Sequence, residues 1–166
     1  MKIFLIGFMG SGKTYWGKLW AEKSGLAFVD LDEIVEGDKG KSAAEIFAKD
    51  GEAHFRELES MALKTFTHKD NIIIACGGGT PCFNDNISWM NKTGSSVYLK
   101  SSPENILKRL ITETEKRPLI KNLQGNELLF YISEKIKERE FFYQQAKFVL
   151  EVDTLTPNYL PGFLNM

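Results

Sequence analysis

The sequence predicts a three-layer α/β/α fold around a parallel β-sheet, in one domain spanning residues 1–166. Short apolar runs typical of buried strands alternate along the chain with segments whose apolar residues recur at helical spacing. A glycine-rich segment, Gly7–Thr14, joins the first such run to the first such helix. Because strands that alternate with helices pair in one parallel sheet with helices on both faces, these observations favour the α/β class.

The segment Gly7–Thr14 reads G-F-M-G-S-G-K-T and matches G-x-x-x-x-G-K-[ST] at every position. Its glycines let backbone N–H groups surround a polyphosphate together with the N-terminus of the next helix. Lys13 brings a positive charge to the β- and γ-phosphates, and Thr14 offers a hydroxyl to Mg²⁺. The apolar run Ile3–Ile6 supplies the buried strand that this motif requires. The expected nucleotide contacts are Gly10, Ser11, Gly12, Lys13, Thr14 and Tyr15.

A second strand, Leu26–Val29, leads into two carboxylates, Asp30 and Asp32. Active groups of α/β sheets gather at the carboxyl ends of strands, where the phosphate loop also begins. In extended chain the two acids point to one side, about 6 to 7 Å apart, so both can face one cleft. Alternatively, either acid caps the helix that follows, and one residue can cap a helix and act in the site as well.

Two helices are predicted next. Ser42–Glu45 is a capping-box pattern that starts the first, and Gly51 is expected to end it. The second has an apolar stripe of Phe55, Leu58, Ala62 and Phe66. Arg56 lies beside this stripe, and its spacing alone favours an ordinary solvent-exposed charge.

The third strand, Ile72–Ala75, runs directly into the glycines Gly77–Gly79. Three glycines after a central strand indicate that the backbone closely approaches another group, and a loose hinge is the alternative. Val97–Leu99 is the fourth strand. Ser102–Glu104 then opens a helix with a cap, a proline in the first turn and an early acid.

Helical periodicity fails over residues 112–125, a polar segment long enough to form a mobile lid. The last long helix has a stripe of Leu129, Ile132, Ile136 and Tyr143. Arg139 lies on this stripe, and burying an arginine is costly unless an anion pairs with it. A carboxylate of the chain or a bound anionic substrate could be that partner. Phe148–Val152 is the fifth strand, and any helix after it is expected to be short.

Composition bounds the function class. Because 21 basic and 22 acidic residues give a formal charge of -1, we expect neither nucleic acid nor an anionic membrane as a partner. No apolar run has the length of a membrane span, and the first residues do not form a secretion signal, which favours a cytoplasmic protein. Cys76 and Cys82 are expected to be reduced packing residues. We expect a monomer.

The ordered motifs of the chain resemble those of the shikimate kinases over nearly its whole length. They are G-F-M-G-S-G-K-T, D-L-D at residues 30–32, G-E-A-H-F-R ending at Arg56, the glycines Gly77–Gly79, R-P-L from Arg117, and Arg139 three residues before Phe142 in R-E-F-F-Y. Only the first of these motifs is specific alone, whereas their order and spacing together are highly specific.

The resemblance implies transfer of the ATP γ-phosphoryl group to the 3-hydroxyl of shikimate, in the route to chorismate and aromatic amino acids. It also implies a P-loop kinase fold with sheet order 2-3-1-4-5, substrate-binding helices at about residues 31–65 and the lid at about 112–125. Carried over by position, Asp32 holds the substrate hydroxyl. Arg56 and Arg139 clamp the shikimate carboxylate, and Gly78 and Gly79 lend backbone N–H groups.

On the nucleotide side, the resemblance implies ATP and Mg²⁺ as cofactors. Asp30 acts on Mg²⁺ through water, beside Thr14. Arg117 reaches the phosphates when the lid closes, and Arg109 lies against adenine. Family members often carry a basic residue just before the proline that matches Pro157, whereas this chain has Leu155 and Thr156 there, so adenine binding is where a departure is expected.

Two alternatives remain open. A gluconate kinase or another small-molecule P-loop kinase shares the phosphate loop, and gluconate is also a carboxylate. A GTP-dependent switch reads guanine with N-K-x-D, but Asn91–Gly94 places a glycine where the aspartate is required.

Overall fold

The computed structural model, in which residues 1–112, 117 and 119–164 are described, contains a five-stranded sheet in the order β2-β3-β1-β4-β5. All four strand pairings are parallel. The strands are β1 (Lys2–Ile6), β2 (Ala27–Asp30), β3 (Ile72–Ala75), β4 (Ser95–Lys100) and β5 (Phe148–Glu151). The predicted class, strand number and strand order are confirmed.

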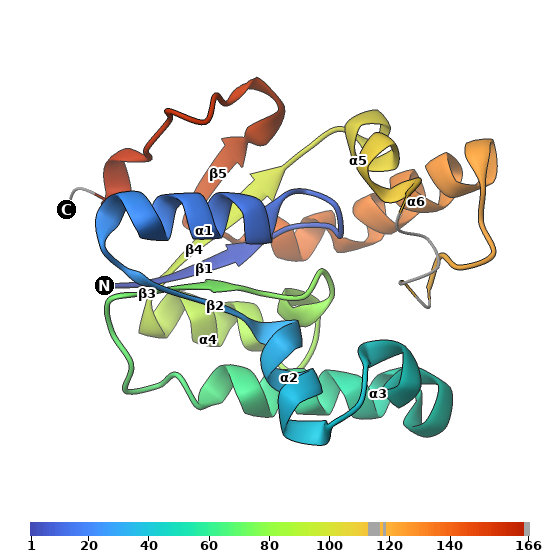
Figure 1. Cartoon of the computed structure of the whole chain (residues 1–166), viewed down its shortest axis with the longest axis horizontal. Coiled ribbons are helices and arrows are strands. Elements are labelled where there is room, and N and C mark those ends of the chain that lie inside the picture. The colour runs from blue at the N-terminus through green and yellow to red at the C-terminus, as the bar shows by residue number, and fades with distance from the viewer. Residues whose placement is uncertain (113–116, 118, 165–166) are drawn as a thin grey trace.

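Helices cover both faces of this sheet (Figure 1). They are α1 (Lys13–Ser24), α2 (Leu31–Lys39), α3 (Ala43–Lys64), α4 (Asn86–Thr93), α5 (Pro103–Leu110) and α6 (Gly125–Tyr143). Successive residues of β1 point to opposite faces: Ile3 and Leu5 pack with α1 and the C-terminal segment, whereas Phe4 and Ile6 pack with α3, α4, α5 and α6. The strand is therefore fully buried and the protein has three layers.

Local signals in the sequence fix several helix boundaries. Ser42 and Glu45 form the predicted capping box at the start of α3. Gly51, with φ 83°, interrupts the helical backbone of α3 with a kink. Gly17 lets α1 approach the sheet, because a Cβ atom there would lie 2.4 Å from the Phe28 ring. After β5 the described chain forms only short 3₁₀ turns, η3 (Val152–Thr154) and η4 (Gly162–Leu164).

The sequence analysis missed helix α4. Its N-cap residue, Asp85, has a left-handed φ of 53° and makes no side-chain capping bond. Of its apolar side chains, Ile87 and Met90 are buried. Without a capping pattern and with only two buried apolar residues, the segment carries little helical signal.

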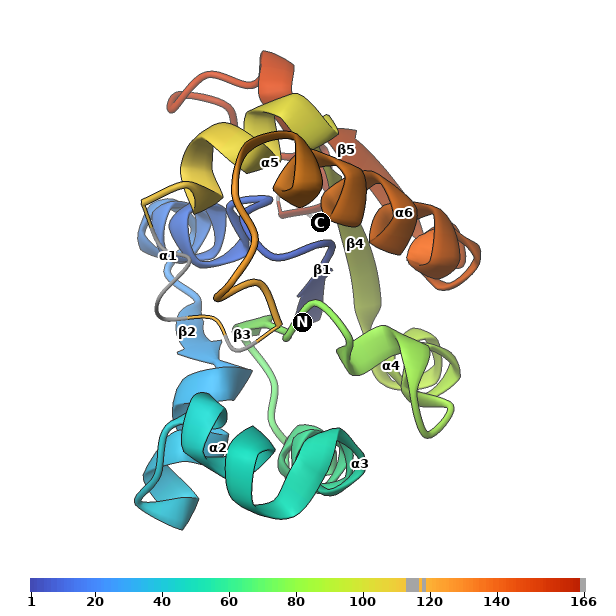
Figure 2. The same cartoon turned by 90° about the vertical axis from the view of Figure 1, so that its right-hand side faces the viewer.

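The carboxyl ends of the strands meet at one edge of the sheet, where the loop after β1 lies. Viewed from this edge, α5 and α6 lie on one side and α2 and α3 on the other (Figure 2). Open α/β sheets bind ligands at this edge. Among the described residues, no helix is long and apolar enough to cross a membrane.

Candidate active site

The phosphate loop connects β1 to α1 in the predicted strand–loop–helix arrangement. Gly7, Gly10 and Gly12 all have positive φ, a conformation that favours glycine. Gly12 is the N-cap of α1 and has no side chain to cap it, so the amide end of the helix faces the loop. Lys13 Nζ donates to the carbonyl oxygens of Gly7 and Phe8, both at 2.9 Å.

Burial lowers the pKa of Lys13 to about 8, against the opposing attraction of Asp32. A half-buried ammonium group in a phosphate loop attracts a polyphosphate strongly, because water screens its charge less than on an open surface. The Ser11 hydroxyl is buried in the same loop and has no hydrogen-bond partner within the described part of the chain.

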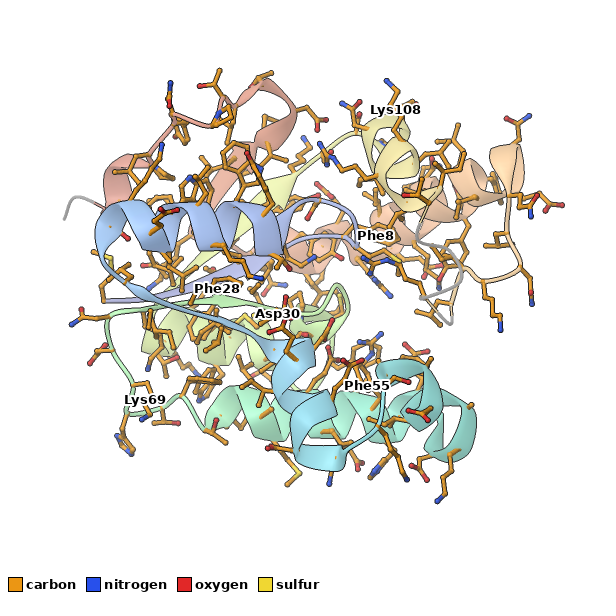
Figure 3. All side chains as sticks on the ribbon, viewed as in Figure 1. Phe8, Phe28, Asp30, Phe55, Lys69 and Lys108 are labelled. Carbon is orange, nitrogen blue, oxygen red and sulfur yellow. The ribbon has the colours of Figure 1, made fainter. Side chains whose placement is uncertain are left out.

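Asp30 connects the phosphate loop to α2. Its Oδ2 accepts a hydrogen bond from Thr14 Oγ1 at 2.7 Å, and its Oδ1 accepts one from the Asp32 N–H at 3.1 Å. Asp30 is therefore the N-cap of α2, as one of the open alternatives stated. Figure 3 shows Asp30 at the point where the strand meets this helix. The hydroxyl and the carboxylate together form a hard-oxygen pair suited to Mg²⁺.

The extended-chain geometry predicted for the two acids is wrong. Strand β2 ends at Asp30 and α2 begins at Leu31, so Asp32 lies in the first helical turn. The alternation rule fails because the capping bond from Asp30 turns the chain one residue earlier than the apolar pattern indicates. Both acids still line one cavity with Lys13 and Thr14.

Asp32 has an unsatisfied carboxylate. Its Oδ1 is buried and has no hydrogen-bond partner among the residues that the structure describes. Burial, together with the charges of Glu59 and Asp30, raises the pKa of Asp32 to about 7. A buried acceptor without a donor is costly, so this oxygen is a place where a ligand hydroxyl gains a hydrogen bond.

A second cavity, of about 330 Å³, adjoins the first and contains the predicted substrate residues Asp32, Arg56, Gly78, Gly79 and Arg139. In Figure 3, Phe8 lies on the phosphate loop and Phe55 lies on α3 across from it. The residues that line this cavity belong to α2, α3 and α6, to the loops after β1 and β3, and to the segment with Arg117 and Leu119. The structure therefore brings together residues that are more than 100 positions apart in the sequence.

Arg56 contradicts the expectation from its spacing, because it is only 5% exposed. Its Nη1 donates to Glu59 Oε2 at 2.7 Å and its Nη2 to Glu52 Oε1 at 2.9 Å. The guanidinium also lies over the rings of Phe47, Phe55 and Phe83, with the closest centroid at 5.0 Å. The apolar pattern of the helix did not indicate that Arg56 is buried. Its burial is tolerated because two carboxylates of the same helix neutralise its charge.

The loop after β3 passes between the two arginines. A Cβ atom at Gly79 would lie 2.5 Å from Arg56 Cζ. One at Gly78 would lie 3.1 Å from the Met9 nitrogen and 3.5 Å from Arg139 Nη1. The close backbone approach predicted for these glycines is confirmed, and a larger side chain at Gly79 would displace the guanidinium.

Arg139 is buried on α6, with 8% exposure, and its guanidinium lies 5.5 Å from the centre of the Phe8 ring. Within the described ranges no carboxylate lies at ion-pair distance from it. Of the alternatives left open for this residue, a bound anion fits better than a carboxylate of the chain, because a buried, uncompensated cation favours an anionic ligand.

Sequence reasoning missed Glu59, which is 0% exposed. Its Oε2 accepts from Arg56, and its Oε1 accepts from Thr80 Oγ1 at 2.7 Å. The spacing of three residues between Arg56 and Glu59 on one helix was the available signal, because such residues are neighbours on a helix surface.

The nucleotide side has a third cavity, lined by Gly12, Tyr15, Arg109, Leu155 and Pro157 among others. Arg109 Nη1 donates to the Gly10 carbonyl at 2.9 Å. This arrangement is compatible with adenine contacts by Arg109 and Tyr15, which remain predictions. Leu155, at the departure noted in the sequence, lines the cavity where a basic residue was expected.

The predicted lid is described only in part. Residues 113–116 and 118 lie outside the described residues. Arg117 lines both the phosphate cavity and the adjoining 330 Å³ cavity. Ile120 is fully buried in the core, which attaches the later part of the segment to the domain.

Comparisons with known proteins agree with this geometry. The sequence model described as shikimate kinase matches residues 9–160. The chain is 41% identical over 154 residues to a shikimate kinase of Parabacteroides distasonis, covering 93% of this chain and 89% of that protein. A similar protein of Azobacteroides pseudotrichonymphae is 42% identical over 158 residues, covering 95% and 93%.

Solved structures give the same result. The crystal structure of shikimate kinase from Bacteroides thetaiotaomicron has a TM-score of 0.89 at 39% identity, covering 93% of this chain and 88% of that one. The structure of shikimate kinase from Acinetobacter baumannii in complex with shikimate has a TM-score of 0.85 at 31% identity, with coverages of 94% and 86%. The chain belongs to the shikimate kinase family.

Proposed function

We propose that the protein transfers the γ-phosphoryl group of ATP to the 3-hydroxyl of shikimate, giving shikimate 3-phosphate and ADP. One observation carries this proposal: a phosphate loop with a half-buried lysine adjoins a cavity that contains two buried guanidinium groups and an unpartnered carboxylate oxygen. A small hydroxy acid fits all of these groups at once. Membership of the family supports shikimate as that acid, which places the reaction in the route to chorismate and aromatic amino acids.

The nucleotide is held by the loop residues Gly10, Ser11, Gly12, Lys13 and Thr14, with Tyr15 and Arg109 on the base side. Phosphoryl transfer asks the protein mainly for alignment and charge neutralisation, because the transferred group passes through a loose transition state. The half-buried charge of Lys13 meets this requirement at the β- and γ-phosphates.

Thr14 and Asp30 are suited to hold Mg²⁺, Thr14 directly and Asp30 through water, because their oxygens already lie 2.7 Å apart. When bound, the metal ion supplies positive charge to the phosphate oxygens. Asp30 keeps its capping bond to the Asp32 N–H in this arrangement, so the metal site and the acceptor site share one short segment.

Asp32 orients the acceptor. A hydroxyl of shikimate donates to the buried Asp32 Oδ1, which places the hydroxyl oxygen in line with the γ-phosphate. With a pKa raised to about 7, Asp32 is basic enough to take the hydroxyl proton during or after transfer. The ammonium group of Lys13 lies on the phosphate side of this carboxylate.

The acid group of the substrate binds between Arg56 and Arg139. Forked hydrogen bonds from two guanidiniums fix both position and orientation of a small rigid acid. Arg56 is already oriented by Glu59 and Glu52, and the backbone N–H groups of Gly78 and Gly79 complete the binding site. The clamp therefore sets the acceptor hydroxyl at a defined distance from the phosphate loop.

We further propose that residues 1–166 act as one domain, with substrate-binding helices at about 31–65 and a lid at about 112–125 that brings Arg117 to the phosphates. Arg117 lines both the phosphate cavity and the acid-binding cavity, which supports this role. A cytoplasmic monomer without nucleic-acid or membrane partners agrees with the balanced charge and with two free cysteines.

An ADP-release assay with shikimate, quinate, gluconate and nucleoside monophosphates tests the proposal. We expect turnover with shikimate to exceed that with every other acceptor by at least about a hundredfold in kcat/KM, because both guanidiniums and Asp32 must be satisfied together. Turnover with gluconate but not shikimate would reject it in favour of the alternative kinase, which the comparisons do not favour. Product identification by phosphorus NMR fixes the hydroxyl that is modified.

A further inference from the structure

The hydroxyl of Tyr143 lies at a junction of the acid-binding residues. Tyr143 is in the last turn of α6 and is 0% exposed. Its hydroxyl donates to the Gly78 carbonyl oxygen at 2.6 Å. Burial raises the pKa of this phenol, and the nearby Arg139 guanidinium opposes that rise. Residues 139 and 143 are one helical turn apart, so both face the loop after β3. The phenol is therefore bonded to the loop and lies near the Arg139 guanidinium.

The hydrogen bond from Tyr143 keeps the Gly78 carbonyl oxygen from turning into the acid-binding cavity. A carbonyl oxygen that accepts from a buried phenol on α6 is held toward that helix. If it turned toward the cavity, its partial negative charge would repel the substrate carboxylate. A glycine has no side chain to restrict such a rotation, so the phenol supplies the restraint that the residue itself lacks.

The contact with Arg139 is the second half of the junction. Arg56 has two carboxylates to orient it, whereas Arg139 has no ion-pair partner within the described residues. The Tyr143 phenol lies near the Arg139 guanidinium, which opposes the effect of burial on the phenol pKa. Gly78, which the phenol holds, is also close to Arg139, because a Cβ atom there would lie 3.5 Å from Arg139 Nη1. A long side chain held in its binding orientation loses less entropy when the ligand arrives.

We propose that Tyr143 is a positioning residue for the acid clamp, which sets Gly78 and Arg139 in the orientation that binds the carboxylate. This inference rests on the proposed function, because it assigns the residue to the acid group of that substrate. Tyr143 does not line the cavity and is not a catalytic residue.

The test is Tyr143→Phe, which removes one oxygen and keeps the ring. We expect the KM for shikimate to rise about tenfold, the loss typical of a buried hydrogen bond near a charge, with kcat and the KM for ATP within about twofold of wild type. Tyr98→Phe is the matched control. Tyr98 is also buried and its ring packs 4.9 Å from that of Tyr143, but its hydroxyl donates to Glu140 Oε2 at 2.9 Å, outside the cavity.

A second substrate separates positioning from a general structural effect. Methyl shikimate has no carboxylate charge, so Tyr143→Phe should lower kcat/KM about tenfold for shikimate and by less than about twofold for the ester. The ratio of the two kcat/KM values does not depend on the fraction of folded enzyme, so it remains valid for a destabilised variant. Equal losses on both substrates, or an equal KM increase in Tyr98→Phe, would overturn the inference. If wild-type enzyme does not phosphorylate shikimate, the proposed function fails instead.

Discussion

The acid clamp and the base side of the nucleotide site both use arginine, but in different surroundings. Arg56 and Arg139 are 5% and 8% exposed and lie in one cavity against aromatic rings. The side chain of Arg109 is 42% exposed and bonds to the Gly10 carbonyl and to Asp153. Buried charges act through a low dielectric and at fixed angles, whereas an exposed charge is screened by water and salt. We therefore expect discrimination between substrates to be concentrated in the proposed clamp of Arg56 and Arg139.

The largest effect is expected at Asp32, which lines both the acid-binding cavity and the phosphate cavity. Asp32→Asn keeps the size of the side chain but removes the charge that holds the acceptor hydroxyl. We expect kcat to fall at least about a thousandfold, measured by ADP release at saturating shikimate. Residual turnover within about tenfold of wild type would mean that another group orients the acceptor.

The same variant also reports on stability. The pKa of Asp32 is raised from 3.8 to about 7 by burial and by the charges of Glu59 and Asp30, so the folded protein binds more protons than the unfolded chain between these values. The free energy of unfolding of the wild type therefore falls as pH rises through this window, and that of Asp32→Asn does not. At pH 8 the variant should have the higher Tm, and at pH 4 the difference should vanish. A variant that melts below wild type at pH 8 would show that the carboxylate has a stabilising partner.

Sequence alone predicted the groups whose spacing carries chemistry. The phosphate loop, the five strands and the glycines after β3 follow from local patterns, because a backbone conformation or a buried run restricts which residues occur there. Arg139 was also identified without the structure, because an arginine on an apolar stripe requires an anion.

The failures at Arg56 and Asp32 share one physical origin, because each depends on a side-chain hydrogen bond that apolar periodicity does not report. Arg56 was expected in solvent, although Glu52 and Glu59 allow it to be buried. Asp32 was assigned to extended chain, although the cap at Asp30 starts a helix before it. Periodicity reports which apolar residues are buried and gives no information about a charge neutralised within its own helix.

Arg139→Ala tests how much a buried arginine of the clamp contributes to binding the acid. Removing one partner of a buried charged pair costs about 2 to 4 kcal/mol, so the KM for shikimate should rise roughly 30- to 1,000-fold. Arg139→Lys keeps the charge without the fork and should recover only part of the affinity. Both losses should persist at high salt, because the pair is shielded from solvent. A change in the KM for ATP alone would show that Arg139 does not bind the acid.

The smallest effect is expected on the base side, at Asp153. Its carboxylate accepts from Ser101 Oγ, the Ser102 N–H and Arg109 Nη2. Although burial raises the pKa of Asp153, the bonds from Ser101 and Ser102 lower it to about 2, so it is ionised at every pH at which the enzyme is assayed. Asp153 thereby holds the guanidinium that bonds to the phosphate loop at Gly10.

Asp153→Asn should raise the KM for ATP about two- to fivefold and leave the KM for shikimate unchanged, because partly exposed ion pairs contribute little. Glu151→Gln is the control, since it removes the charge from the exposed Lys100–Glu151 pair, at 3.0 Å, at the end of β5, two residues before Asp153 and away from the base cavity. Raising the salt concentration should shrink the difference between Asp153→Asn and wild type, whereas the Arg139→Ala difference should stay constant. If both differences respond to salt alike, burial does not separate the two regions, and the exposed arginine contributes to recognition as strongly as the clamp.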